Sequence, residues 1–174
     1  MKTGIIAFAS LLASAVLALI SNTAPAQTYP TRSIRLIVPF PPGGATDTTG
    51  RIIAQALSEG LGQQVVPDNR PGATGRIGTE LVAKAPPDGY TLLLGSAGPN
   101  AILPGAYSKL PYDAVKDFAP ISLIGASDHV LVVHPSMPVK SVKDVIGLAR
   151  SKPGQLTFAS AGNLSVAHLS AELF

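Results

Sequence analysis

The segment that decides the fold is Ser33-Ile34-Arg35-Leu36-Ile37-Val38-Pro39-Phe40-Pro41-Pro42-Gly43-Gly44. Its first half is a β-branched, apolar run that ends at Pro39, which predicts a buried strand over residues 33–38. Its second half is a tight turn rich in proline and glycine. A helix is expected to begin at Thr46 or Asp47 and to stop near Gly60 and Gly62. We expect its apolar face to comprise Ile52, Ile53, Ala56, Leu57 and Leu61.

The alternation of apolar runs and helical patterns continues along the chain. Further strands are predicted at 64–66, 90–94 and 156–159, and further helices at 77–83, 141–150 and from about residue 165. Ser141 is the expected N-cap of the second of these helices. The runs 121–124 and 130–133 fit either a strand pair or a long crossover between lobes. This alternation predicts βαβ units, a mainly parallel sheet and an α/β fold.

Composition excludes several classes of protein. The 174 residues are 46% hydrophobic and 13% charged, with no cysteine. A chain with this balance and no repeat can bury a core, so disorder, coiled coil and collagen are excluded. Without cysteine there is no disulfide framework, thiolate metal site or cysteine nucleophile. The formal net charge is +3 and the basic residues are scattered, so no nucleic-acid surface is predicted.

Residues 1–26 have the pattern of an export signal. Lys2 is followed by an apolar stretch over 5–20, and Ala24-Pro25-Ala26 offers the small residues that a signal peptidase accepts. A cleaved signal would make Gln27 the first mature residue and would place the protein in the periplasm. An uncleaved membrane anchor is the alternative. Outside the cytoplasm ATP and NAD are not dependably supplied, so no nucleotide cofactor is expected.

Three loops share one design, because each follows a predicted strand, is rich in small residues and leads towards a helix. At the carboxyl ends of parallel strands, helix N-termini present backbone N–H groups that suit a carboxylate or a phosphate. We therefore predict an anion site in these loops. Its residues would be Gly43, Gly44, Ala45, Thr46, Asp47, Ser96, Ala97, Gly98, Asn100, Ser160, Ala161, Gly162, Asn163 and Ser165.

Two alternatives apply to these loops. They fit ordinary βα turns as well, and Asp47 fits a cap of the first helical turn better than a partner for a ligand amine. The loops hold no P-loop, dinucleotide fingerprint or nucleophile elbow. His129, His134 and His168 lack metal-ligand spacing, so neither a catalytic nor a metal site is predicted. A secreted α/β hydrolase using Ser160 or Ser96, with His168 near Ser160, remains an alternative.

Several motifs together resemble one known family. Residues 29–30 (YP), 34–44 (IRLIVPFPPGG), 69–73 (NRPGA), 84–92 (KAPPDGYTL), 110–113 (LPYD), 117–120 (DFAP) and 160–163 (SAGN) are similar to Bug-type receptors. So are Asp47, Arg51, Ser165, the pair 168–169 and the final residues 172–174. Bug-type receptors are the periplasmic solute-binding proteins of tripartite tricarboxylate transporters. The matches cover essentially the whole mature chain.

The resemblance implies a two-lobed, flytrap-like α/β receptor that captures a small carboxylate, performs no catalysis and delivers the ligand to membrane transporter subunits. Its binding loops would be the three already named. It implies lobe one over 27–124, and a hinge crossing with the start of lobe two over 125–174. We expect a monomer, with neither cofactor nor metal. Leu164 and Val166 depart from the family pattern, as do Asn100 and Leu103, and the first two favour a less polar ligand.

Family receptors are roughly twice as long as this chain, which implies an N-terminal fragment. Such a fragment lacks part of both lobes, so we expect weak or absent ligand affinity for it alone. A truncated product without function is a further alternative.

Overall fold

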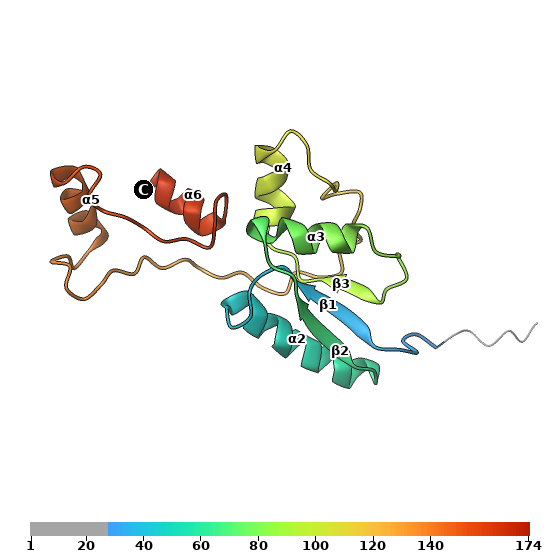
Figure 1. The fold of residues 1–174 in the computed structure, drawn as a ribbon. Helices are drawn as coiled ribbons and strands as arrows, with labels where there is room; N and C mark the ends of the chain where they lie inside the picture. Colours follow the sequence, from blue (N-terminus) through green and yellow to red (C-terminus); the bar gives the residue numbers. More distant parts are fainter. Residues whose placement is uncertain (1–27) are drawn as a thin grey trace, which may run out of the picture. The chain divides into compact units, whose positions relative to one another are not determined.

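The computed structural model describes residues 28–174; the predicted export signal lies outside the described residues. Residues 28–31 contain no helix or strand and belong to a different unit from residues 32–174. In the second unit the elements are, in chain order, β1 (Ile34–Val38), α2 (Ala45–Leu61), β2 (Val65–Asn69), the 3₁₀ turn η1 (Ala73–Gly75), α3 (Arg76–Ala83), β3 (Thr91–Leu93), the π-helical turn η2 (Gly98–Ile102), α4 (Leu103–Ala106), α5 (Val142–Ser151) and α6 (Val166–Leu173) (Figure 1).

Three parallel strands form the sheet, in the order β2-β1-β3. Ile34 pairs with Val65 on one side, and Leu36 pairs with Leu92 on the other. The strands predicted at 33–38, 64–66 and 90–94 are thus present and parallel, although β2 continues to Asn69, beyond its predicted end. Because the chain turns from one side of β1 to the other after β2, the strand order reverses at β1. In open α/β sheets, ligands bind at such a reversal.

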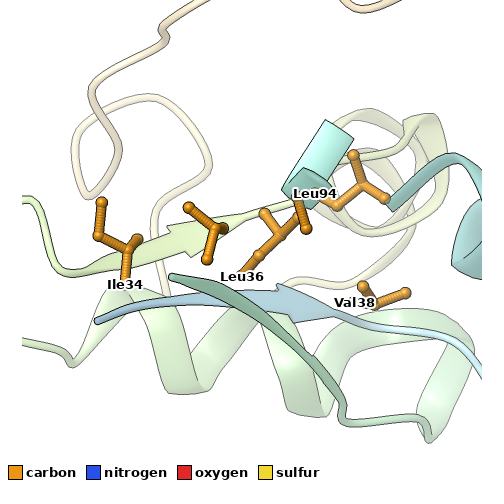
Figure 2. Close-up of a cluster of buried hydrophobic side chains, with 6 residues drawn as sticks. Ile34, Leu36, Val38 and Leu94 are labelled. Carbon is orange, nitrogen blue, oxygen red and sulfur yellow. The ribbon is translucent and has the colours of Figure 1, made fainter. Parts of the chain in front are cut away.

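One face of the sheet packs against α2. Alternate residues of β1 point to this face, and Ile34, Leu36 and Val38 join Leu94 in a buried cluster (Figure 2). Ala54 of α2 and Val65 complete the cluster. The predicted apolar face of α2 is therefore only partly right: Leu57 packs against this cluster and Ile53 is half-buried, whereas Ile52, Ala56 and Leu61 are exposed.

The buried stripe of α2 comprises Asp47, Gly50 and Ala54, which lie three to four residues apart on one side of a helix. A β-carbon on Gly50 would lie 2.9 Å from Val38 Cγ2 and 3.2 Å from Leu94 Cδ2. The absence of a side chain at position 50 thus lets the helix backbone approach the strands. A count of large apolar residues overlooks a contact made by glycine.

The other face of the sheet packs against α3, so that the two helices lie on either side of it (Figure 1). Ile37, which points away from the α2 cluster, is fully buried. Gly78 of α3 lies against Pro39 and the carbonyl of Arg70. Thr79 is also buried, and its hydroxyl donates to the carbonyl of Gly75 at 2.9 Å. The α/β layering predicted from the sequence is present.

Beyond α4 the chain is extended, and residues 117–134 contain no helix or strand. The crossover interpretation of 121–124 and 130–133 therefore fits better than a strand pair. The prediction of a strand at 156–159 is wrong. Within the described residues no neighbouring strand forms hydrogen bonds with this segment. Ser141 does cap α5, since its side chain accepts from the Asp144 N–H. Within residues 28–174 no helix is long and apolar enough to cross a membrane.

Candidate ligand-binding site

The loops after β1, β2 and β3 meet at one end of the sheet because the three strands are parallel (Figure 1). The first loop leads directly into α2. Gly43 adopts φ +84°, a conformation that favours glycine, and Gly44 is the N-cap. No side chain caps α2 at Gly44. The first N–H groups of a helix have no partner within it, so Ala45 and Thr46 present donors to this end of the sheet.

Asp47 holds this loop together. It lies in the first turn of α2 but is not the N-cap, and its side chain is only 4% exposed. Its carboxylate accepts hydrogen bonds from Arg51 Nε at 3.0 Å, from the Gly43 N–H at 2.9 Å and from Asn69 Nδ2 at 2.9 Å. These donors, Arg51 foremost, lower the pKa of the Asp47 carboxyl from 3.8 to about 2. Asp47 is therefore not the cap of α2 that the sequence suggested, because Gly44 is the N-cap. The negative charge of Asp47 is paired with Arg51.

The second predicted loop is partly helical, which corrects the expectation of a plain polar loop. Gly98 begins η2, and Pro99 in its first turn is compatible with a helix start. Asn100 Oδ1 accepts from the Ser96 N–H at 3.3 Å, so that the Asn100 side chain closes the loop on itself. The Ser96 hydroxyl is buried and has no hydrogen-bond partner among residues 28–174. A buried hydroxyl without a partner costs free energy unless a ligand or water satisfies it.

The third predicted loop precedes α6. Ser165 is the N-cap of α6, and its hydroxyl accepts from the His168 N–H at 3.1 Å. Ser160 Oγ accepts from the Gly162 N–H at 3.3 Å. His168 Nε2 lies 4.0 Å from Glu172 Oε1, and its ring lies 5.8 Å from that of Phe158. No hydrogen bond between Ser160 and His168 is present in the described residues.

A fourth loop, Gly72–Arg76, joins the others, and sequence reasoning assigned it no ligand role. Thr74 Oγ1 donates to the carbonyl of Asn163 at 2.6 Å. A β-carbon on Gly98 would lie 3.5 Å from Thr74 Cγ2, and one on Gly75 would lie 3.2 Å from Pro99 Cγ. The loop after β2 thus contacts both the second and the third predicted loops.

This fourth loop has an unusual backbone. Ala73 and Thr74 have φ values of +47° and +57°, in a region that L-residues rarely adopt and that is especially unfavourable for a β-branched side chain. Such strain persists where the surrounding structure enforces it, and it concentrates at ligand sites. A signal for the loop was available in the sequence, since Gly72-Ala73-Thr74-Gly75 also follows a strand and precedes a helix.

A pocket of about 410 Å³ lies against these loops. Of the predicted site residues, Ala161, Gly162 and Asn163 line it; those of the first two loops do not. Its other lining residues come from the loops after β1 and β2, from the start of α3, and from the first residue and the C-cap of α4, and they are Pro39, Phe40, Pro41, Pro71, Gly72, Ala73, Thr74, Gly75, Arg76, Leu103 and Tyr107. Within residues 28–174, no group of three or more histidine, aspartate or glutamate side chains could hold a metal ion.

Comparison with known proteins finds relatives over most of this chain. Residues 49–174 match the family described as "Tripartite tricarboxylate transporter family receptor" (TctC). Protein BugT of Bordetella pertussis is 45% identical over 150 residues, which are 86% of this chain and 46% of BugT.

Two solved structures are also similar. One, described as "R. palustris Rpa4515 with adipate", has a TM-score of 0.80 and 43% identity over 83% of this chain and 48% of its own. The periplasmic binding protein BugD has a TM-score of 0.72 and 33% identity over the same 83% of this chain and 48% of BugD. The chain spans about half the length of these relatives.

Proposed function

Because the chain belongs to the tripartite tricarboxylate transporter receptor family, we propose that it is part of an exported receptor that binds a small carboxylate. The family resemblance drawn from the sequence is confirmed, and the fold is that of periplasmic binding proteins. The receptor would act in the periplasm after cleavage of residues 1–26 and would deliver its ligand to the membrane subunits of a tripartite transporter. Residues 27–124 would belong to lobe one and residues 125–174 to the hinge and lobe two. It would act as a monomer and without catalysis.

One observation carries this proposal: the loops at the reversal of strand order present main-chain donors and a buried, unpartnered hydroxyl. The N–H groups at the start of α2 lack a side-chain cap, and Ser96 Oγ lacks a partner in the described residues. A carboxylate satisfies both kinds of donor, and hydrogen bonds to an ionised acceptor are the stronger ones. Asp47 would not repel it, because its own charge is paired with Arg51.

The predicted site residues take distinct parts in this proposal. The first loop (Gly43 to Asp47) and the second (Ser96 to Asn100) would bind one carboxylate. The third loop, with Ser160, Ala161, Gly162, Asn163 and Ser165, would cover the ligand from lobe two. The adipate of the solved relative Rpa4515 supports a linear dicarboxylate as the ligand. The Thr74–Asn163 hydrogen bond supports contact between the loops of the two predicted lobes.

Calorimetric titration with adipate tests the proposal. We expect binding to the longest form of the protein that the gene encodes, and about tenfold weaker binding by Ser96→Ala, which removes one hydrogen bond to a charged acceptor. Ser122→Ala is the matched control, since Ser122 is exposed and lies outside the predicted loops. The 174-residue chain alone should bind weakly or not at all.

The hydrolase alternative makes the opposite prediction. It requires turnover of a model ester that Ser160→Ala or Ser96→Ala abolishes, whereas a receptor is stabilised thermally by its ligand and releases it unchanged. Ester turnover of this kind, or a failure of adipate, malate and citrate all to bind, would contradict the receptor function.

A further inference from the structure

The pocket between the loops after β1 and β2, the third predicted loop and α4 has a single charged lining residue. Of its lining residues, Arg76 alone carries a formal charge; the others are apolar, glycine or neutral polar residues. Phe40 and Leu103 supply apolar surface, while Thr74 and Tyr107 supply hydroxyl groups. A volume of about 410 Å³ lies within the range of small-molecule sites. A lone guanidinium in a largely apolar pocket favours a ligand with one anionic end and an aliphatic body.

Within residues 28–174 no acidic side chain forms an ion pair with Arg76, although Arg76 and Glu80 both act on the hydroxyl of Tyr112. Arg76 is half-buried and is the first residue of α3, where the helix dipole disfavours a cation. The first turn of α3 contains no acidic residue, and no side chain caps it. Glu80, one turn further along the helix, pairs with Lys84 instead.

Three other arginines, which lie in β1, in α2 and directly after β2, are paired. Arg51 binds Asp47, and Arg35 and Arg70 both bind Asp68. Their charges are therefore already used within the fold. Arg76 differs from them in combining a pocket, an unfavourable helix position and no counterion. This combination is expected where the counterion is the ligand.

We infer that Arg76 binds the second carboxylate of a dicarboxylate ligand and thereby separates a diacid from a monocarboxylate of the same chain length. The inference rests on the proposed function, in which the first carboxylate lies on the main-chain donors of the loops after β1 and β3. Guanidinium and carboxylate form paired, charge-assisted hydrogen bonds. The aliphatic body of the ligand would lie along Phe40 and Leu103.

Titration of adipate against hexanoate tests this role, because the two have the same number of carbons and differ by one carboxylate. The wild-type protein, in the longest form that the gene encodes, should prefer adipate. Arg76→Gln should weaken adipate binding about 10- to 100-fold and leave hexanoate binding nearly unchanged. Arg76→Lys should fall between the two, since lysine keeps the charge but loses the planar fork. Arg150→Gln, an exposed cation on α5 outside the pocket, is the control.

The same variants also show whether weaker adipate binding results from unfolding, if their melting temperatures are measured. Removing a cation from the start of α3 should leave the melting temperature unchanged or raise it slightly. If Arg76→Gln keeps the preference of the wild-type protein for adipate, the inference is wrong and the receptor function stands. If neither adipate nor any other carboxylate binds the wild-type protein, the proposed function itself fails.

Discussion

Gly78→Ala is expected to destabilise the fold by about 2 kcal/mol, even though alanine is the better helix former. A β-carbon at position 78 would lie 2.8 Å from the carbonyl oxygen of Arg70, 2.9 Å from Pro39 Cβ and 3.0 Å from Pro39 Cα. Two of these atoms are backbone atoms, which cannot rotate away. The helix α3 would have to move off the sheet, and the loop after β2 would move with it.

Gly60→Ala is the matched control, because Gly60 lies in α2 and a β-carbon there would meet nothing within 4 Å. This variant should gain about 0.5 kcal/mol from helix propensity and from the smaller entropy of its unfolded chain. Urea titration followed by circular dichroism gives both values. Equal stability of the two variants would show that α3 does not pack on Pro39 as closely as described.

Asp47→Asn is expected to lower the stability of the fold at neutral pH and to flatten the dependence of that stability on pH below about 4. The carboxylate accepts from Arg51, Gly43 and Asn69, and these donors hold its pKa at about 2, against 3.8 for an ordinary aspartate. A carboxyl whose pKa is lowered by folding stabilises the folded state above about pH 4. This contribution is lost as the pH falls towards 2, where the folded form also binds the proton.

The measurement is the urea midpoint between pH 6 and pH 2 for wild type and Asp47→Asn. At pH 6 the variant should be clearly less stable, because its amide cannot accept from all three donors as a carboxylate does. The difference should shrink as the pH approaches 2. Asp128→Asn, at an exposed position, should follow the wild-type curve. A difference that stays constant with pH would show that Asp47 is not ionised in the fold.

Those elements whose cause is local were predictable from the sequence. β1 follows from a β-branched run ending at proline, and Ser141 and Ser165 cap their helices through their own hydroxyls. The buried face of α2 was not predictable in this way, because it depends on Gly50 meeting Val38 across the core. The strand expected at 156–159 failed because a strand requires a partner, and its own residues do not specify one.

In the candidate site, too, features with a local cause were predictable from the sequence and features that depend on distant residues were not. The loops after β1 and β3 carry glycine and hydroxyl signals that the sequence displays openly. The burial of Asp47 under Arg51 and Asn69 becomes visible only when β2 lies beside β1. The backbone of Thr74 adopts a left-handed conformation that suits glycine and that a β-branched residue disfavours, so no local signal in the sequence indicates it. The Thr74 hydroxyl donates to the carbonyl of Asn163, which lies 89 residues away in the sequence.

The strained backbone at Thr74 has a consequence for directed evolution. Under selection for heat tolerance alone, glycine at position 74 should be enriched early, because it relieves a conformation that costs an L-residue about 1–2 kcal/mol. The same change deletes the hydroxyl that reaches Asn163. Selection that also demands ligand binding should therefore retain threonine at position 74. The two selections should thus yield different residues at this position.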